Sequence, residues 1–445
     1  MSQRYDRLGL ILPAFILLVY AAAFIYGEFR PGTRWTLDSY EYEAAAKNLV
    51  ESGTFYAGDL DGARDPALYS RRTPLYPLIL WLPLELAPDG AWVALLQIAM
   101  SLTAAGLLGA ILRSVGVAGW PRRLAMAAFL LYPAQIIYSQ SVMAEILLQF
   151  LLLLALYGLV RYRSSGSWRD AALMNLALAL APLAKPIAVF FWIPNLMFWG
   201  WLVLRERRRM ALVLLALLPL LSVSLWSYRN LRVTGHYHFS SIVSRYVRYM
   251  TPRNERSRAE GRAFAETDRA DWQAFWRSRI EDWPSTLWYY ARGSGLFFVD
   301  PGRFDVYQFF GMKQDVSGIR IVRASPRERW DLLGQIDPLV LVYMVVLTLL
   351  NLLILAGFVI ALFLPRIPWV VRVFAILVVS YITAAVGLAG FSRYRLAIEP
   401  YLLLGATVTA VWLLQRRATR PSATAGTQEP DPRLDASSTP GPQSG

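Results

Sequence analysis

The chain has 445 residues, of which 56% are hydrophobic, and its charged side chains give a net charge of +14. Long apolar runs recur along it, which is typical of a polytopic helical membrane protein and excludes a soluble multidomain protein. The absence of cysteine and the presence of only two histidines exclude disulfide frameworks, thiol nucleophiles and histidine-built metal centres. No cofactor is predicted, although a divalent metal held by carboxylates is not excluded.

The charge does not indicate nucleic-acid binding, because most excess basic residues lie in short loops between apolar segments, where they set membrane orientation. With the amino terminus inside, five basic loops are cytoplasmic: 113–123, 161–169, 205–209, 365–372 and 415–420. Both termini are then cytoplasmic. We therefore expect a multi-pass protein of the plasma (bacterial inner) membrane.

Ten apolar segments are long enough, or nearly so, to cross the bilayer. They lie at about 8–26, 91–112, 124–139, 142–160, 170–184, 187–204, 210–227, 337–363, 369–389 and 398–414. The sequence therefore predicts an all-α polytopic membrane protein with about ten transmembrane helices.

Four regions follow from these spans. Residues 1–227 form a predicted transmembrane catalytic module with a first outer loop at 27–90. An outer region at 228–336 separates it from C-terminal transmembrane helices at 337–417. The remainder, 418–445, lacks apolar content and is predicted to be a disordered cytoplasmic tail.

The first outer loop contains two predicted interfacial helices. Leu37–Ser52 has an apolar face, is capped by Asp38 or Ser39, and ends at Gly53. Leu75–Leu86 is too short to cross and contains prolines, and counting it as a span would invert every later loop. We place it on the outer surface.

Several polar side chains are expected at the outer surface. Gln135, Gln140 and Glu145 lie at the tip of one pair of short spans, and Lys185 lies at the tip of the next. Ionisable groups at such positions are costly unless they face a wet cavity or each other. The aromatic-rich segment 272–298 is either a membrane-hugging helix or a binding surface.

Asp38 is the strongest candidate for chemistry. An acid on a short helix at the hydrocarbon boundary can act as a general base whose pKa is adjusted by partial burial, and the alternative is a helix cap. The D-x-D spacing of Asp59 and Asp61 matches a metal-binding pattern, but an ordinary turn is the alternative.

Basic residues also gather on the outer side. Lys185 is one of only three lysines, and its ammonium suits a phosphate oxygen. The alternative is that its side chain only extends to the membrane interface. Arg393 and Arg395, like Arg71 and Arg72, indicate either an anionic ligand or membrane anchoring. Glu145 either pairs with a basic residue or hydrogen-bonds to a substrate.

These features occur in a recognisable order. The motifs are L-D-S-Y-E-Y (37–42), R-R-T-P-L-Y-P (71–77), Y-S-Q-S-V-M-A-E (138–145), P-L-A-K-P (182–186), W-S-Y-R-N-L-R-V-T-G-H-Y (226–237) and S-R-Y-R-L-A-I-E-P (392–400). Together they resemble the membrane glycosyltransferases of the C superfamily (GT-C). The resemblance is to family 39 and its bacterial relatives, which include protein O-mannosyltransferases and aminoarabinose lipid A transferases.

The resemblance implies an inverting transferase that moves a sugar from a polyprenyl-phosphate donor to a glycolipid, polymer or protein acceptor outside the membrane. Asp38 matches the loop acid proposed as the base. Lys185, Arg393, Arg395 and Arg72 are then predicted to bind the donor phosphate, and Glu145, Tyr76 and Tyr394 to bind other parts of the substrate.

One departure concerns the loop acid. The family often has a second acid directly beside it, whereas Ser39 follows Asp38 here, and Glu41 and Glu43 lie further along. A role that needs adjacent acids is therefore in doubt.

Two other classes remain possible. A transporter or flippase for an anionic lipid or lipid-linked sugar would have outward charges, and a scaffold would use its aromatic loop to bind a partner. Transporters usually show pseudo-repeats and charges near mid-membrane, whereas the ionisable groups here lie at the outer ends of the spans. This placement favours the enzyme.

Overall fold

The computed structural model describes residues 2–206, 211–242, 273, 276–277, 279–312, 325–386 and 392–418. In these ranges the chain is helical and contains no strand, which confirms the predicted all-α membrane class. The α-helices are α1 (Ser2–Phe29), α2 (Leu37–Ser52), α3 (Leu75–Leu86), α4 (Ala91–Ser114), α5 (Gly119–Leu130), α6 (Pro133–Gln140), α7 (Glu145–Ser165), α8 (Trp168–Ala184), α9 (Trp192–Glu206), α10 (Ala211–Ala216), α11 (Leu218–Thr234), α15 (Trp283–Val299), α16 (Arg303–Phe309), α18 (Pro326–Gly334), α19 (Pro338–Ala361), α20 (Trp369–Val386) and α21 (Glu399–Ala418). Four 3-10 helices are η1 (Pro31–Arg34), η2 (Pro66–Tyr69), η3 (Pro186–Ala188) and η4 (Ser392–Ala397).

Seven helical stretches in the described part of the chain are long and apolar enough to span a membrane. They are Ile11–Phe29, Ala91–Ser114, Glu145–Ser165, Pro186–Leu204, Leu214–Thr234, Pro338–Ala361 and Trp369–Val386. The other three predicted spans, 124–139, 170–184 and 398–414, fall on α5 with α6, on α8 and on α21.

Two of the predicted spans are not continuous helices, because a new helix with proline in its first turn starts inside each. The segment 124–139 is not one helix, because α5 ends at Leu130 and Pro133 begins α6. The segment 210–227 is interrupted at Leu217, where a new helix starts with Pro219 in its first turn. The second helix, α11, continues to Thr234, so the predicted boundary at residue 228 lies inside it.

The long central helix α7 is the most buried of the seven stretches and forms the middle of the bundle. It packs against α8, α4 and α20. A Cβ added at Gly158 would come within 2.8 Å of the Met174 backbone nitrogen, so only glycine allows α7 and α8 to approach this closely. A glycine also allows α19 to pack closely against α21, where Gly357 faces Ala406.

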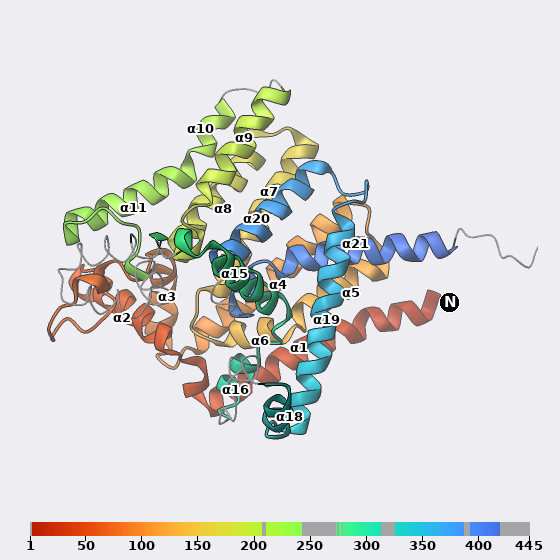
Figure 1. The fold of residues 1–445 in the computed structure, drawn as a ribbon, viewed down its shortest axis with the longest axis horizontal. Coiled ribbons are helices and arrows are strands. Elements are labelled where there is room, and N and C mark those ends of the chain that lie inside the picture. Colours follow the sequence, from red (N-terminus) through yellow and green to blue (C-terminus); the bar gives the residue numbers. More distant parts are fainter. Residues whose placement is uncertain are drawn as a thin grey trace, which may run out of the picture.

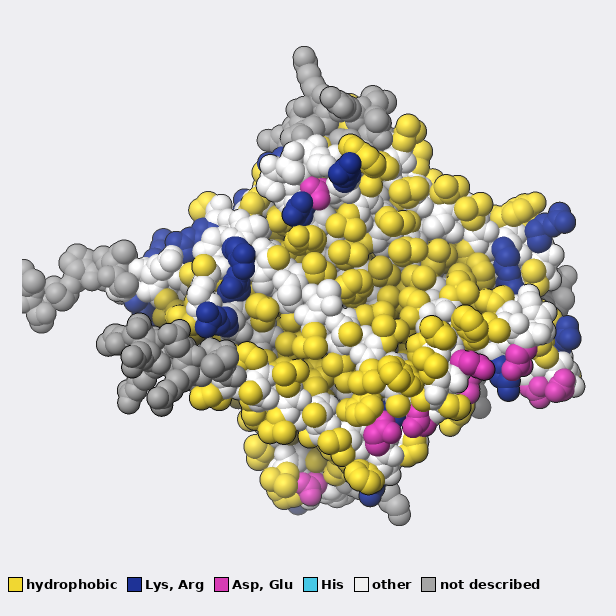
Figure 2. All heavy atoms as spheres, turned by 180° about the vertical axis from the view of Figure 1, so that it is seen from behind, with side chains coloured by type: hydrophobic (Ala, Val, Ile, Leu, Met, Phe, Trp, Pro, Cys, Tyr) yellow, Lys and Arg dark blue, Asp and Glu magenta, His cyan; other side chains and the backbone are white. Residues whose placement is uncertain are grey.

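Apolar side chains cover much of the lateral surface of the helix bundle. Figure 2 shows a broad hydrophobic field on one face, with charged side chains gathered toward its edges. On α19, Leu339, Val342 and Leu353 are largely exposed. A surface of this kind is stable only against lipid, and the chain is therefore a multi-pass membrane protein.

The start of α1 and the end of α21 both lie at the right of Figure 1, whereas α2 and α3 lie at the left. The helix α2 has the predicted bounds, and it ends where Gly53 adopts a φ of 67°. The predicted cap, Asp38 or Ser39, was wrong by two or three residues. Thr36 is the N-cap, and it forms a capping box with Ser39.

The helix α3 also has its predicted bounds, and it packs against α2 through an edge-on contact of Tyr76 with Tyr42. The second half of the aromatic-rich segment 272–298 belongs to α15. Trp283 and Trp288 are exposed there, whereas Phe297 is buried. Residues 272, 274, 275 and 278 and the predicted disordered tail from residue 419 onward lie outside the described residues.

Candidate active site

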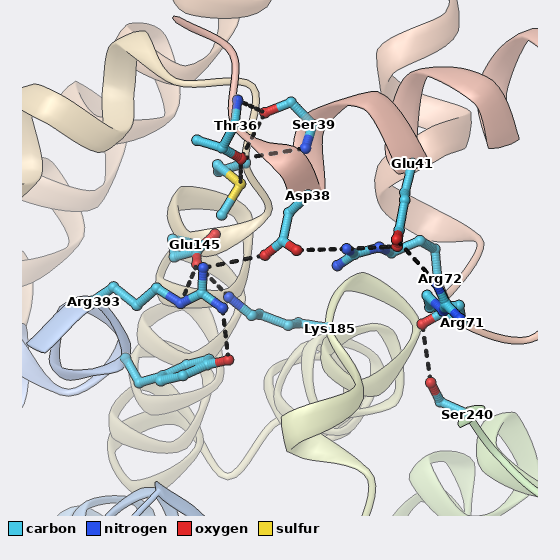
Figure 3. Close-up of polar contacts among 12 residues, drawn as sticks. Thr36, Asp38, Ser39, Glu41, Arg71, Arg72, Glu145, Lys185, Ser240 and Arg393 are labelled. Atoms are coloured by element: carbon cyan, nitrogen blue, oxygen red, sulfur yellow. Dashed lines mark hydrogen bonds and ion pairs between the residues drawn. The ribbon is translucent and has the colours of Figure 1, made fainter. Parts of the chain in front are cut away.

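Charged side chains from five separate segments meet at one place (Figure 3). They are Asp38 of α2, Arg72 before α3, Glu145 at the start of α7, Lys185 after α8, and Arg393 of η4. Asp38 and Arg393 are 355 residues apart in sequence. Such convergence of distant segments on a few ionisable groups is the usual architecture of a functional site.

Local structure positions Asp38. Because the Thr36–Ser39 capping box satisfies the first turn of α2, Asp38 is not needed as a cap, and its carboxylate turns toward the cluster. The Thr36 hydroxyl also contacts the Met143 sulfur at 3.2 Å, and the Val142 backbone N–H donates to the Arg34 carbonyl at 2.9 Å. These contacts fix the start of the first outer loop against the turn before α7.

The Asp38 carboxylate lies between two arginines. Its Oδ1 is 2.7 Å from Arg72 Nη2, and its Oδ2 is 3.1 Å from Arg393 Nη1. Burial alone would raise the pKa of Asp38, but the charges of Arg72 and Arg393 outweigh burial and lower it to about 2. The carboxylate is therefore fully ionised at neutral pH.

Glu41 supplies a second acid one helical turn after Asp38. Its Oε2 accepts a hydrogen bond from Arg72 Nε at 2.8 Å, and its Oε1 is 3.2 Å from Arg71 Nη1. The Arg72 guanidinium is therefore shared by two carboxylates, and it also lies over the Tyr42 ring at 4.6 Å. The charge of Arg72, which was predicted to bind phosphate, is engaged by Asp38 and Glu41 in this structure.

Glu145 holds two cations together at the base of the cluster. Its Oε1 forms an ion pair with Lys185 Nζ and lies 3.9 Å from Arg393 Nε. Glu145 is 3% exposed, and its Oε2 has no hydrogen-bond partner among the described residues. A buried carboxylate between two cations offsets their mutual repulsion, so Lys185 and Arg393 can point to one place.

Aromatic packing orients the same cations. Lys185 Nζ lies 4.6 Å and the Arg393 guanidinium 4.9 Å from the Tyr394 ring centroid. Arg393 Nη2 also donates to the Tyr394 hydroxyl at 3.0 Å. Lys185 is the C-cap of α8 and has an extended backbone, and Pro186 after it begins η3, so α8 ends at the lysine.

Two predicted site residues lie elsewhere. Arg395 points away from the cluster: its Nη1 donates to the carbonyls of Phe298 and Asp300, and its Nε is 3.3 Å from Glu399. It therefore ties η4 to the end of α15. Tyr76, predicted to contact substrate, is buried, and its hydroxyl donates to Gln97 at 3.1 Å.

A cavity of about 250 Å³ opens beside the cluster. Asp38 and Arg393 form part of its wall together with α6 and α16. The other lining residues include Thr33, Thr36, Leu37, Ile137, Tyr138, Ser141, Met143, Phe304, Asp305, Gln308 and Phe309. Apolar and aromatic walls with a few convergent polar groups are typical of a small-ligand site.

Sequence reasoning missed Asp305 of α16. Its Oδ1 accepts a 2.7 Å hydrogen bond from the Tyr138 hydroxyl, and Ser392 Oγ lies 3.5 Å from its Oδ2. Burial raises the pKa of Asp305 to about 6; Asp300 adds to the rise, and the Tyr138 hydrogen bond and Arg393 oppose it. An acid within the aromatic run R-F-D-V-Y-Q-F was the available signal.

The D-x-D pair forms a turn. The Asp61 backbone N–H donates to Asp59 Oδ1 at 2.9 Å, which is a local turn contact. No group of three or more His, Cys, Asp or Glu side chains lies close enough for a metal ion in the described part of the chain.

Comparisons with known proteins give a weak likeness. No family model and no curated protein matches the chain. Among solved structures it is similar to ArnT from Cupriavidus metallidurans bound to undecaprenyl phosphate, with 14% identity, a TM-score of 0.38, and coverage of 90% of this chain and 77% of that one.

The apo state of the same ArnT gives equal identity and TM-score over 91% of this chain and 78% of that one. At this identity and TM-score the likeness carries no argument about activity. The chemistry must be judged from the side chains.

Proposed function

We propose that the chain is an inverting glycosyltransferase that moves a sugar from a polyprenyl-phosphate donor to an envelope acceptor on the outer face of the membrane. The observation that carries this proposal is the placement of one ionised acid, Asp38, at the wall of a cavity and 3.1 Å from Arg393, with Lys185 joined to Arg393 through Glu145. Transfer from a lipid phosphate needs a base and a phosphate clamp side by side.

The proposed reaction uses these groups in one displacement. The acceptor hydroxyl gives its proton to the Asp38 carboxylate while its oxygen bonds to the anomeric carbon. The bond from that carbon to the phosphate oxygen breaks, and its electron pair remains on the phosphate. Lys185 and Arg393 stabilise the negative charge that grows there.

Donor binding also activates the base. In the free protein Arg393 is paired with Asp38 at 3.1 Å, which keeps the carboxylate a weak base. A phosphate that engages Arg393 and Lys185 neutralises part of this positive charge, so the pKa of Asp38 rises once donor is bound. The carboxylate then accepts a proton more readily in the donor complex than in the free protein.

A transport assay separates the enzyme from a flippase for the same anionic lipid. Purified protein in lipid vesicles is given radiolabelled polyprenyl-phosphate sugars and an envelope extract as acceptor. We expect label to move onto an acceptor. Transbilayer movement of intact donor without any transfer would favour the flippase, and heat-denatured protein is the control.

Sidedness is tested by single cysteines, because the chain has none of its own. Ser52 at the end of α2 and Ser165 at the end of α7 are both exposed. A membrane-impermeant maleimide added to intact cells should label Ser52→Cys and spare Ser165→Cys until the membrane is opened. Labelling of position 165 in intact cells would contradict the proposed orientation.

A further inference from the structure

We propose that Asp305, held by Tyr138, is a substrate-binding residue that hydrogen-bonds the hydroxyl groups of a sugar ring in the cavity beside Asp38 and Arg393. This inference rests on the proposed function, and it names a subsite and residues within it. The two carboxylates, Asp38 and Asp305, both line the same cavity but belong to segments far apart in sequence.

The size and walls of the cavity favour one sugar ring. Its volume of about 250 Å³ lies below the usual range of drug-sized sites, so it suits a single ring rather than a lipid chain. Phe304 and Phe309 of α16 line it, and they offer the apolar faces against which the C–H face of a sugar can pack. Asp305 lies between them in sequence and supplies the polar contact.

The Asp305 carboxylate has unused hydrogen-bonding capacity. Tyr138 donates to Oδ1 at 2.7 Å, whereas the Ser392 hydroxyl is at the limit of hydrogen-bond distance from Oδ2. A carboxylate can accept about four hydrogen bonds. Asp305 therefore keeps acceptor sites for substrate hydroxyls, and Tyr138 fixes its direction.

The position of α16 is fixed by packing, which a binding residue requires. Tyr26 of α1 packs against Phe309 with the ring centroids 5.5 Å apart. Gly302, with a φ of 74°, is the N-cap of α16, and a Cβ there would lie 3.2 Å from Asp305 Oδ2. Glycine at this turn leaves room for the carboxylate.

The stability of Asp305→Asn shows whether a loss of binding comes from unfolding. Because burial holds the pKa of Asp305 above its ordinary value, the ionised form destabilises the fold at neutral pH. An asparagine keeps the acceptor for Tyr138 and removes that charge. Asp305→Asn should therefore unfold at the same temperature as the native chain or at a higher one, so a functional loss would not come from unfolding.

The test measures carrier binding in nanodiscs without any need for turnover. The probes are bare polyprenyl phosphate and a panel of polyprenyl-phosphate pentoses and hexoses. We expect Asp305→Asn to weaken binding of the preferred sugar-bearing carrier by roughly 10- to 100-fold, the worth of hydrogen bonds to a charged group. Binding of the bare carrier should stay within about twofold.

Two further variants complete the comparison. Tyr138→Phe should give a smaller loss in the same direction, because it frees the carboxylate to turn. Asp331→Asn removes an exposed acid from α18 and should change nothing. Thermal midpoints of all variants show whether each is folded.

The acceptor KM of Asp305→Asn shows whether the sugar ring in the cavity belongs to the donor or to the acceptor. If the ring in the cavity belongs to the acceptor, Asp305→Asn leaves carrier binding alone and raises the acceptor KM by a similar factor. Unchanged carrier binding together with an unchanged acceptor KM overturns the inference while leaving the proposed function intact. If the native chain binds none of the carriers, the proposed function fails and this inference falls with it.

Discussion

Asp38→Asn is expected to slow sugar transfer by roughly 100- to 10,000-fold, the usual worth of a positioned general base. Donor binding should be unchanged or tighter. The reason is the ion pair of Asp38 with Arg393, because removing the carboxylate frees a guanidinium that the phosphate otherwise has to capture. The measurements are donor affinity and single-turnover rate in the same lipid.

Stability needs its own control in this experiment. The lowered pKa of Asp38 means that the carboxylate stabilises the fold above its ordinary pKa of 3.8, and that this contribution disappears as the pH falls through about 2. Asp38→Asn should therefore cost on the order of 2 kcal/mol of stability at neutral pH. Rates are compared per folded molecule, with Glu51→Gln at the exposed end of α2 as the matched control.

The pH dependence of the transfer rate tests the same role of Asp38. Protonation removes the base, so the rate falls on the acid side. The fall of kcat on the acid side should occur at a higher pH than the fall of kcat/KM. The reason is that bound phosphate offsets the arginine charges and so raises the pKa of Asp38 in the donor complex. A fully active Asp38→Asn variant, or one that fails only by losing donor affinity, would refute the assignment of Asp38 as the base.

Lys185→Met is expected to weaken donor binding by about 1.5–3 kcal/mol, or roughly 10- to 150-fold, and to slow turnover as well. In the proposed reaction, the ammonium contacts the phosphate both in the bound donor and when the leaving group gains charge. Arg393→Met should have a similar effect. Combining the two should cost less than the sum, because both hold one phosphate.

Glu145 provides the sharper test of this clamp. In Lys185→Met the buried Glu145 carboxylate keeps only Arg393 as a partner, so it competes with phosphate for that arginine. Adding Glu145→Gln should therefore recover part of the lost donor affinity. Lys47→Met, on the exposed face of α2, is the matched control. Strictly additive losses with no recovery would show that these side chains do not share a phosphate.

The sequence predicted the elements that have strong local signals. The bounds of α2 and α3 followed from Ser52-Gly53 and from a short proline-containing apolar run. The break between α5 and α6 was missed because hydrophobicity alone does not distinguish a continuous helix from one that restarts at Pro133.

The site was predicted in part. Asp38, Lys185 and Arg393 were selected by residue type and sidedness, and the structure brings them together. Arg395 was grouped with Arg393 because they are neighbours, yet two positions apart on the 3-10 helix η4 point to different sides. Asp305 could not be placed, since its position depends on the packing of α16 against α6, which are far apart in sequence.

The distance of 355 residues between Asp38 and Arg393 has a consequence for biosynthesis. The first of these residues emerges from the ribosome 355 residues before the second. A nascent chain therefore has the acid and its Arg72 partner in the membrane long before the residue that completes the phosphate clamp. Under the proposed function, chains that stop before η4 should insert into the membrane and yet be unable to use the lipid-linked donor.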